Sequence, residues 1–126
     1  MIPEPKLRKV ADPPRVAIVG SRDFPSQYIV ERFIYKLPEH WVIISGGARG
    51  VDTFVEKTAL HHHRDMIVYK PDWAKFGKNA GFMRNNTIVR DADMVVAFHH
   101  NNSKGTKHSI QLAKYLNKPC VIVRML

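Results

Sequence analysis

The stretch Val42-Ile43-Ile44-Ser45-Gly46-Gly47-Ala48-Arg49-Gly50-Val51-Asp52 decides the fold of this chain. Its apolar, β-branched start predicts a buried strand, and a helical pattern begins directly after the glycines. Glycine adopts positive φ and lets a ligand approach the backbone, and the unpaired amides at a helix N-terminus favour an anion. Arg49 adds a guanidinium to the same turn. The stretch therefore predicts a strand–turn–helix site for phosphate, with a purely structural tight turn as the alternative.

The composition is that of one globular domain, with 126 residues, 44% hydrophobic content and one cysteine. Residues 1–14 are polar and proline-rich, without the apolar segment of a secretory signal, and no apolar run is long enough to span a membrane. We expect a flexible tail over residues 1–14, a folded domain over residues 15–126, a cytoplasmic location and no membrane partner. Cys120 lies beside an apolar run and is expected to be a buried structural thiol.

The net charge of +9 is unevenly distributed along the chain. No acidic residue follows Asp93, whereas five basic residues do. This balance favours anionic partners such as nucleotides, nucleic acid or acidic lipid, with a solvated basic face as the alternative.

Apolar runs alternate with helical patterns along the folded part of the chain. Strands are predicted over residues 15–19, 41–44, 66–69, 94–98 and 120–123, and helices over residues 28–37, 51–62, 81–91 and 109–117. The apolar positions of the third helix include Phe82, Met83 and Ile88. Continuous apolar strands separated by helices are typical of a parallel sheet that is covered on both faces. The predicted fold is α/β, a single doubly wound Rossmann-like domain with a five-stranded, mainly parallel sheet.

Ligands of such a sheet bind beyond the carboxyl ends of its strands, and the loops predicted there are polar, glycine-bearing and basic. Trp73 is a candidate for stacking on a base, with packing onto the sheet edge as its alternative. The full set of candidate ligand-binding residues is Gly20, Ser21, Arg22, Ser45, Gly46, Gly47, Ala48, Arg49, Gly50, Asp72, Trp73, Lys78, Asn85, Ser103, Lys104, Gly105 and Thr106.

No cofactor or metal is expected. The adjacent histidines His61, His62 and His63 point to different sides of a predicted helix end, where interaction with the helix C-terminus explains them better than a shared metal does.

Four motifs together resemble the SLOG superfamily, a Rossmannoid group that contains the LOG-type phosphoribohydrolases and the DNA-processing protein DprA. The motifs occupy residues 19–24, residues 45–52, residues 71–73 with 77–78, and residues 104–106. Within the superfamily, the chain is most similar to the small YpsA/YspA-related proteins. The resemblance extends from about residue 15 to residue 123. It implies a site for a nucleotide or nucleotide-derived ligand, and a homodimer.

The resemblance also bears on catalysis. LOG enzymes cleave the N-glycosidic bond of nucleoside monophosphates with an arginine and a glutamate, and the resemblance puts Arg84 at the arginine position and Ser109 at the glutamate position. A serine cannot act as the required carboxylate. Asp23, Asp52 and Asp72 are possible substitutes, and Arg84 and Asp52 are the candidate catalytic residues if the protein is an enzyme.

We therefore expect a binding module that senses or sequesters a nucleotide-derived small molecule, rather than an enzyme. The first alternative is a phosphoribohydrolase-like N-glycosidic hydrolase. The second is DprA-like binding of single-stranded nucleic acid, which the charge of +9 favours.

Overall fold

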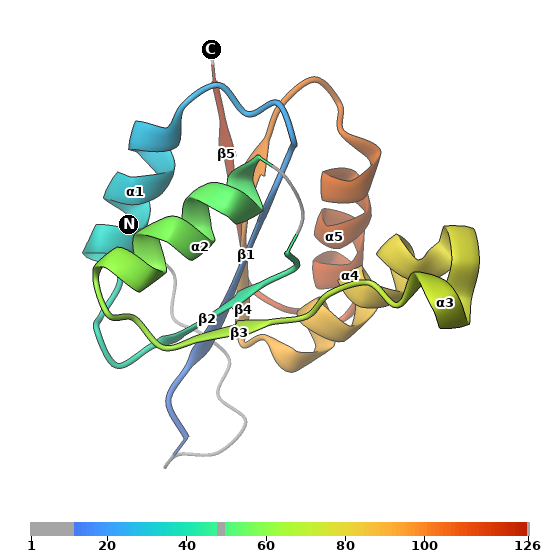
Figure 1. Ribbon diagram of the computed structural model, residues 1–126, viewed down its shortest axis with the longest axis horizontal. Helices are drawn as coiled ribbons and strands as arrows, with labels where there is room; N and C mark the ends of the chain where they lie inside the picture. Colours follow the sequence, from blue (N-terminus) through green and yellow to red (C-terminus); the bar gives the residue numbers. More distant parts are fainter. Residues whose placement is uncertain (1–11, 48–49, 126) are drawn as a thin grey trace.

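In the computed structural model, which describes residues 12–47 and 50–125, parallel strands alternate with helices (Figure 1). The strands are β1 (Arg15–Gly20), β2 (Val42–Ser45), β3 (Met66–Val68), β4 (Met94–His99) and β5 (Cys120–Arg124). The helices are α1 (Gln27–Lys36), α2 (Val51–His61), α3 (Trp73–Phe76), α4 (Ala80–Asp91) and α5 (Lys104–Tyr115), and the 3-10 turn Gly77–Asn79 joins α3 to α4.

The strands form one sheet in the order β3-β2-β1-β4-β5, and every neighbouring pair is parallel. Ala17 of β1 lies opposite Ile44 of β2 on one side and Val95 of β4 on the other. The chain winds outward from β1 to β3 and then crosses to the other side of β1. The carboxyl ends of β1 and β4 therefore flank the switch point, where α/β sheets open a crevice for ligands.

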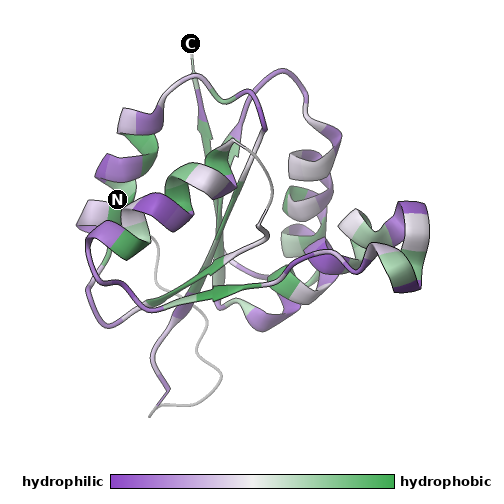
Figure 2. Ribbon diagram, viewed as in Figure 1, coloured by the Kyte–Doolittle hydropathy of each residue, from purple (hydrophilic) through white to green (hydrophobic). Residues whose placement is uncertain are grey.

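Successive side chains of the central strands point to opposite faces of the sheet and belong to two separate cores. Ile18 and Phe98 pack beneath α1 and α2, whereas Ala17 and Ala97 pack beneath α4 and α5, and these four side chains are fully buried. Figure 2 shows the apolar strands inside and the polar faces of the helices outside. Burial on both faces confirms the predicted doubly wound α/β fold.

The edge strands are less buried than their apolar sequences predict. Residues of β3 are only half-buried, and β5 alternates between half-buried and exposed positions, because each of these strands has a neighbour on one side only. Cys120 is accordingly half-buried, which corrects the expectation of a buried thiol. The remaining burial still raises the pKa of Cys120, so the thiol is less reactive than an exposed one.

Two helical segments depart from the predicted boundaries, and a polar cap explains each. Ser103 caps α5, its hydroxyl accepting a hydrogen bond from the Thr106 amide at 3.4 Å, so this helix begins five residues before the predicted position 109. Asp72 accepts a hydrogen bond from the Lys75 amide at 3.1 Å and starts the short helix α3, where a loop was expected. Caps act through hydrogen bonds and not through apolar spacing, so hydrophobic periodicity misses them.

Two features are absent from residues 12–47 and 50–125. None of the helices there combines the length and apolar character that crossing a bilayer requires. In the same ranges, no group of three or more His, Cys, Asp or Glu side chains is arranged to hold a metal ion. The three histidines lie at the end of α2, where His61 is the last helical residue and His63 has a φ of 54°.

Candidate functional site

Ser21 joins the two loops that flank the switch point. Its hydroxyl donates to the carbonyl oxygen of His100 at 3.0 Å and accepts from the His100 amide at 2.8 Å. The Ser21 amide donates to the carbonyl oxygen of Phe98 at 3.0 Å. The loop after β1 is therefore held against the loop after β4 through a fully buried side chain.

The glycine turn after β2 contacts the loop after β1 closely. Gly47 has a φ of 68° and Gly50 a φ of 74°, a conformation that favours glycine. A Cβ on Gly50 would lie 2.3 Å from the carbonyl oxygen of Arg22. Gly50 thus allows the two loops to meet, and it begins α2 without a side-chain cap. The predicted ligand contacts Ala48 and Arg49 lie outside the described residues.

Arg84 of α4 reaches the same turn from the opposite side. Its Nη1 donates to the carbonyl oxygen of Gly46, and its Nε donates to Oδ1 of Asn85 at 3.0 Å. Burial lowers the pKa of Arg84, the nearby Asp52 carboxylate opposes this shift, and Arg22 adds to it. The guanidinium is thus positioned by hydrogen bonds before any ligand arrives.

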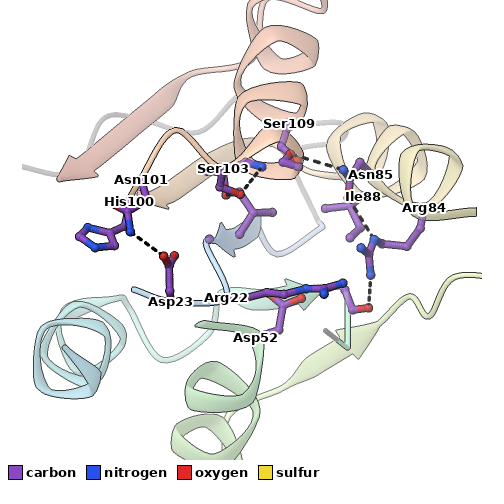
Figure 3. Close-up of a pocket in the computed structure, with 15 residues that line it drawn as sticks. Arg22, Asp23, Asp52, Arg84, Asn85, Ile88, His100, Asn101, Ser103 and Ser109 are labelled. Atoms are coloured by element: carbon purple, nitrogen blue, oxygen red, sulfur yellow. Dashed lines mark hydrogen bonds between the residues drawn. The ribbon is translucent and has the colours of Figure 1, made fainter. Parts of the chain in front are cut away.

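These elements enclose a cavity of about 360 Å³ at the carboxyl edge of the sheet (Figure 3). Two guanidinium groups, of Arg22 and Arg84, and two carboxylates, of Asp23 and Asp52, line it. Asp23 accepts a hydrogen bond from Asn101 at 2.8 Å, and Asp52 is 6% exposed. The described residues that line it are Val19, Gly20, Arg22, Asp23, Gly46, Asp52, Arg84, Asn85, Ile88, His100, Asn101, Ser103, Gly105, Thr106 and Ser109. Among these residues the two positive and two negative charges balance, so they do not by themselves select an anion strongly.

A wider groove of about 730 Å³ continues from the cavity and shares four lining residues with it, Arg22, Arg84, Asn85 and Gly105. Lys78 adds a third cation, and no carboxylate is among the described residues that line the groove. The rings of Trp73 and Phe82 border it and are 58% and 47% exposed. The groove therefore combines positive charge with exposed aromatic surface, whereas the cavity combines both signs of charge.

Most of the predicted ligand-binding residues lie together at this edge. The cavity or the groove is lined by Gly20, Arg22, Gly46, Gly47, Trp73, Lys78, Asn85, Ser103, Gly105 and Thr106. The candidate catalytic residues Arg84 and Asp52 line the cavity, as does Ser109.

Five predicted residues of the described chain line neither the cavity nor the groove, and Gly50, at the loop contact described above, is one of them. Ser21 and Ser45 are fully buried. Ser21 joins the loops after β1 and β4, whereas the Ser45 hydroxyl at the end of β2 has no hydrogen-bond partner among the described residues. Asp72 caps α3 and lines a smaller neighbouring pocket with Tyr69, Lys70 and Arg84. Lys104 is exposed in the first turn of α5.

Asn85 makes polar contacts inside the protein, although asparagine is unfavourable within a helix. It is 7% exposed, and its Nδ2 lies 3.3 Å from Nδ1 of His108. Burial lowers the pKa of His108, which favours the neutral imidazole. Asn85 thus connects the Arg84 guanidinium to α5.

Two groups of residues that line the site were not among the candidate ligand-binding residues. Phe82 was counted among the apolar positions of its helix, yet its ring is exposed and borders the groove. His100 and Asn101 line the cavity because the loop after β4 turns back sharply, with φ values of 52° at both Asn101 and Asn102. The Asn-Asn pair was the available signal, since asparagine adopts this conformation more readily than most residues.

Comparisons with known proteins give a consistent family. The sequence profile of the family described as DNA recombination-mediator protein A matches residues 6–72. The Gene 61 protein of Mycobacterium phage D29 is 31% identical over 117 residues, which cover 85% of this chain and 94% of that protein. The family match supports the DprA side of the SLOG resemblance, and the closer placement with YpsA-related proteins stays a prediction.

A solved structure shares the fold. DNA processing protein A from Helicobacter pylori, whose structure was described for a single-stranded DNA binding mode, superimposes with a TM-score of 0.70 at 23% sequence identity. The match covers 88% of this chain and 65% of that chain. This chain therefore spans just under two thirds of that protein.

Proposed function

Because the chain belongs to the family of DNA recombination-mediator protein A, we propose that it binds single-stranded DNA in the groove between α3, α4 and the turn after β2. The observation that carries the proposal is the lining of this groove. Arg22, Lys78 and Arg84 contribute three positive charges, and no carboxylate of the described residues offsets them there. A polymer with one negative charge per nucleotide gains most from such a surface.

Two further observations support a polymer over a small ligand. The sequence favoured a nucleotide-derived small molecule and kept single-stranded nucleic acid as an alternative, and the family relationship supports that alternative. The groove is also twice the volume of the cavity that it adjoins, about 730 against 360 Å³, and continues past it toward α3. A strand that enters the groove has a continuous surface to follow, whereas a mononucleotide would fill only part of it.

Trp73 gives the groove an affinity for bases as well as for phosphates. Its indole is more than half exposed at the start of α3 and borders the groove with Lys78. Stacking of a base on such a ring contributes about 1–3 kcal/mol and does not depend on which base is present. We therefore expect binding with little sequence preference.

The test is the binding of a fluorescently labelled oligothymidylate, followed by anisotropy at several salt concentrations. Log affinity should fall with log salt by about 0.7 for each phosphate contacted. Arg22→Gln should weaken binding and reduce this slope by about 0.7. Lys57→Gln removes the same charge from the exposed surface of α2 and is the matched control.

Three results would contradict the proposal. The first is an absence of binding to the oligonucleotide. The second is an equal effect of Lys57→Gln and Arg22→Gln, which would indicate nonspecific attraction to a basic surface. The third is complete displacement of the oligonucleotide by a mononucleotide at the same concentration of phosphate groups, which would favour a small nucleotide-derived ligand.

A further inference from the structure

Phe82 presents an aromatic ring to the groove at a position where helix packing does not require one. It lies in the first turn of α4 and is 47% exposed. Its ring meets the His108 ring edge-to-face, with centroids 4.7 Å apart and an interplanar angle of 77°. This contact from α5 holds the ring in place, while nearly half of the residue stays available to a ligand.

Two glycines keep the same groove open. Gly81 and Gly105 lie in the first turns of α4 and α5, and both line the groove. A Cβ built on either glycine meets no heavy atom within 4 Å. Neither glycine has the positive φ that would require this residue type. Glycine costs a helix up to about 1 kcal/mol relative to alanine, so packing and backbone geometry do not explain these two positions.

We propose that the groove holds two unpaired bases of one strand, one stacked on Trp73 and the other on Phe82, in the space that Gly81 and Gly105 leave free. The proposal rests on the proposed function and adds how two bases of the bound strand are held. Both rings border one groove with Arg22, Lys78 and Arg84, so the bases meet aromatic surface while their phosphates meet the cations. In a duplex the faces of the bases are covered by their neighbours, so this groove selects single strands.

The first test compares Phe82→Ala with the wild-type protein on an oligothymidylate and on an abasic oligonucleotide of the same length. Loss of one stacked base lowers the affinity for oligothymidylate by about five- to 150-fold. Affinity for the abasic strand stays unchanged, because the phosphate contacts remain. Phe76→Ala is the matched control, since this phenylalanine of α3 is 36% exposed and lines a neighbouring pocket that neither Trp73 nor Phe82 borders.

The second test fills the groove without disturbing the fold. Gly81→Leu places a side chain where no protein atom lies within reach of the Cβ, and leucine is the better helix former. Thermal unfolding at an equal or higher temperature than wild type, together with at least about tenfold weaker binding of oligothymidylate, is the expected result. A stable Gly81→Leu protein with wild-type affinity would overturn the proposal.

Failure of this inference is distinguishable from failure of the proposed function. If the wild-type protein does not bind oligothymidylate, both fail. If it binds with the expected salt dependence but Phe82→Ala and Phe76→Ala have equal effects, only the two-base site is overturned. Equal affinity for a duplex of the same length overturns it as well.

Discussion

Replacing Gly50 by alanine is expected to destabilise the protein by about 2–5 kcal/mol. Gly50 has φ 74° and ψ −120°, a combination that L residues with a side chain rarely adopt. The new Cβ would lie 2.3 Å from the carbonyl oxygen of Arg22 and 2.6 Å from its Cα. Both are backbone atoms, so no rotamer change relieves the contact, and the loop after β1 has to move away from the start of α2.

The magnitude combines two costs. A residue held in a sparsely populated backbone region costs about 1–3 kcal/mol, and overpacking of this one close contact adds about 1–2 kcal/mol. For a chain of 126 residues, each kcal/mol lowers the midpoint of thermal unfolding by about 4 °C. The midpoint for Gly50→Ala is therefore expected to fall by roughly 8–20 °C.

Gly105→Ala is the matched control for the same change of residue. Its Cβ meets no heavy atom within 4 Å, and its helical position gains up to about 1 kcal/mol from alanine. Thermal and urea unfolding, followed by circular dichroism, compare the two variants with the wild type. A Gly50→Ala protein that unfolds within a few degrees of wild type, or a Gly105→Ala protein that is equally destabilised, would refute the close contact between the two loops.

Three further predictions concern the site and the core. Trp73→Ala should weaken oligothymidylate binding by about 1–3 kcal/mol in the anisotropy assay, whereas Trp73→Phe should retain most of the affinity; equal losses would argue against stacking. Ser21→Ala leaves the His100 amide without its partner and removes one of the two donors to the His100 carbonyl oxygen, which keeps the Ser103 amide. The change should cost about 1–3 kcal/mol in urea unfolding, and an unchanged stability would mean that the loops do not depend on this contact. Lowering the pH from about 7.5 to 5.5 should reduce the free energy of unfolding. Burial and two neighbouring cations lower the pKa of His99 in the folded protein. As the pH falls below the ordinary histidine pKa of about 6.5, the unfolded chain therefore binds a proton at His99 more readily than the folded chain does. His99→Gln should flatten that dependence, and identical pH profiles for the two proteins would exclude His99 as its source.

Much of the fold was predictable because it depends on local composition. Apolar β-branched runs cannot remain exposed, and their alternation with helical patterns leaves few arrangements other than a parallel sheet between two helical layers. The described strands start and end within one residue of the predicted positions. The same alternation of strands and helices predicts that the site lies at the carboxyl edge of the sheet. Most of the candidate residues do lie there together.

Contacts between residues distant in the sequence were decided only by the tertiary structure. Ser21 bonds to His100 across 79 positions, and Arg84 bonds to Gly46 across 38, and neither partner carries a local signal of the other. Phe82 was not identified as a site residue for the same reason: helical spacing identifies an apolar face, but the packing of α4 against α5 and the sheet decides which of its residues are covered. The sequence by itself determined the sheet, its covered faces and the edge at which the candidate site lies, since these follow from the free energy of burying apolar side chains. The separation of a charge-balanced cavity from a cationic, aromatic groove arose only when loops and helices from distant parts of the chain met in space. The sum of their charges depends on distances that the sequence does not contain.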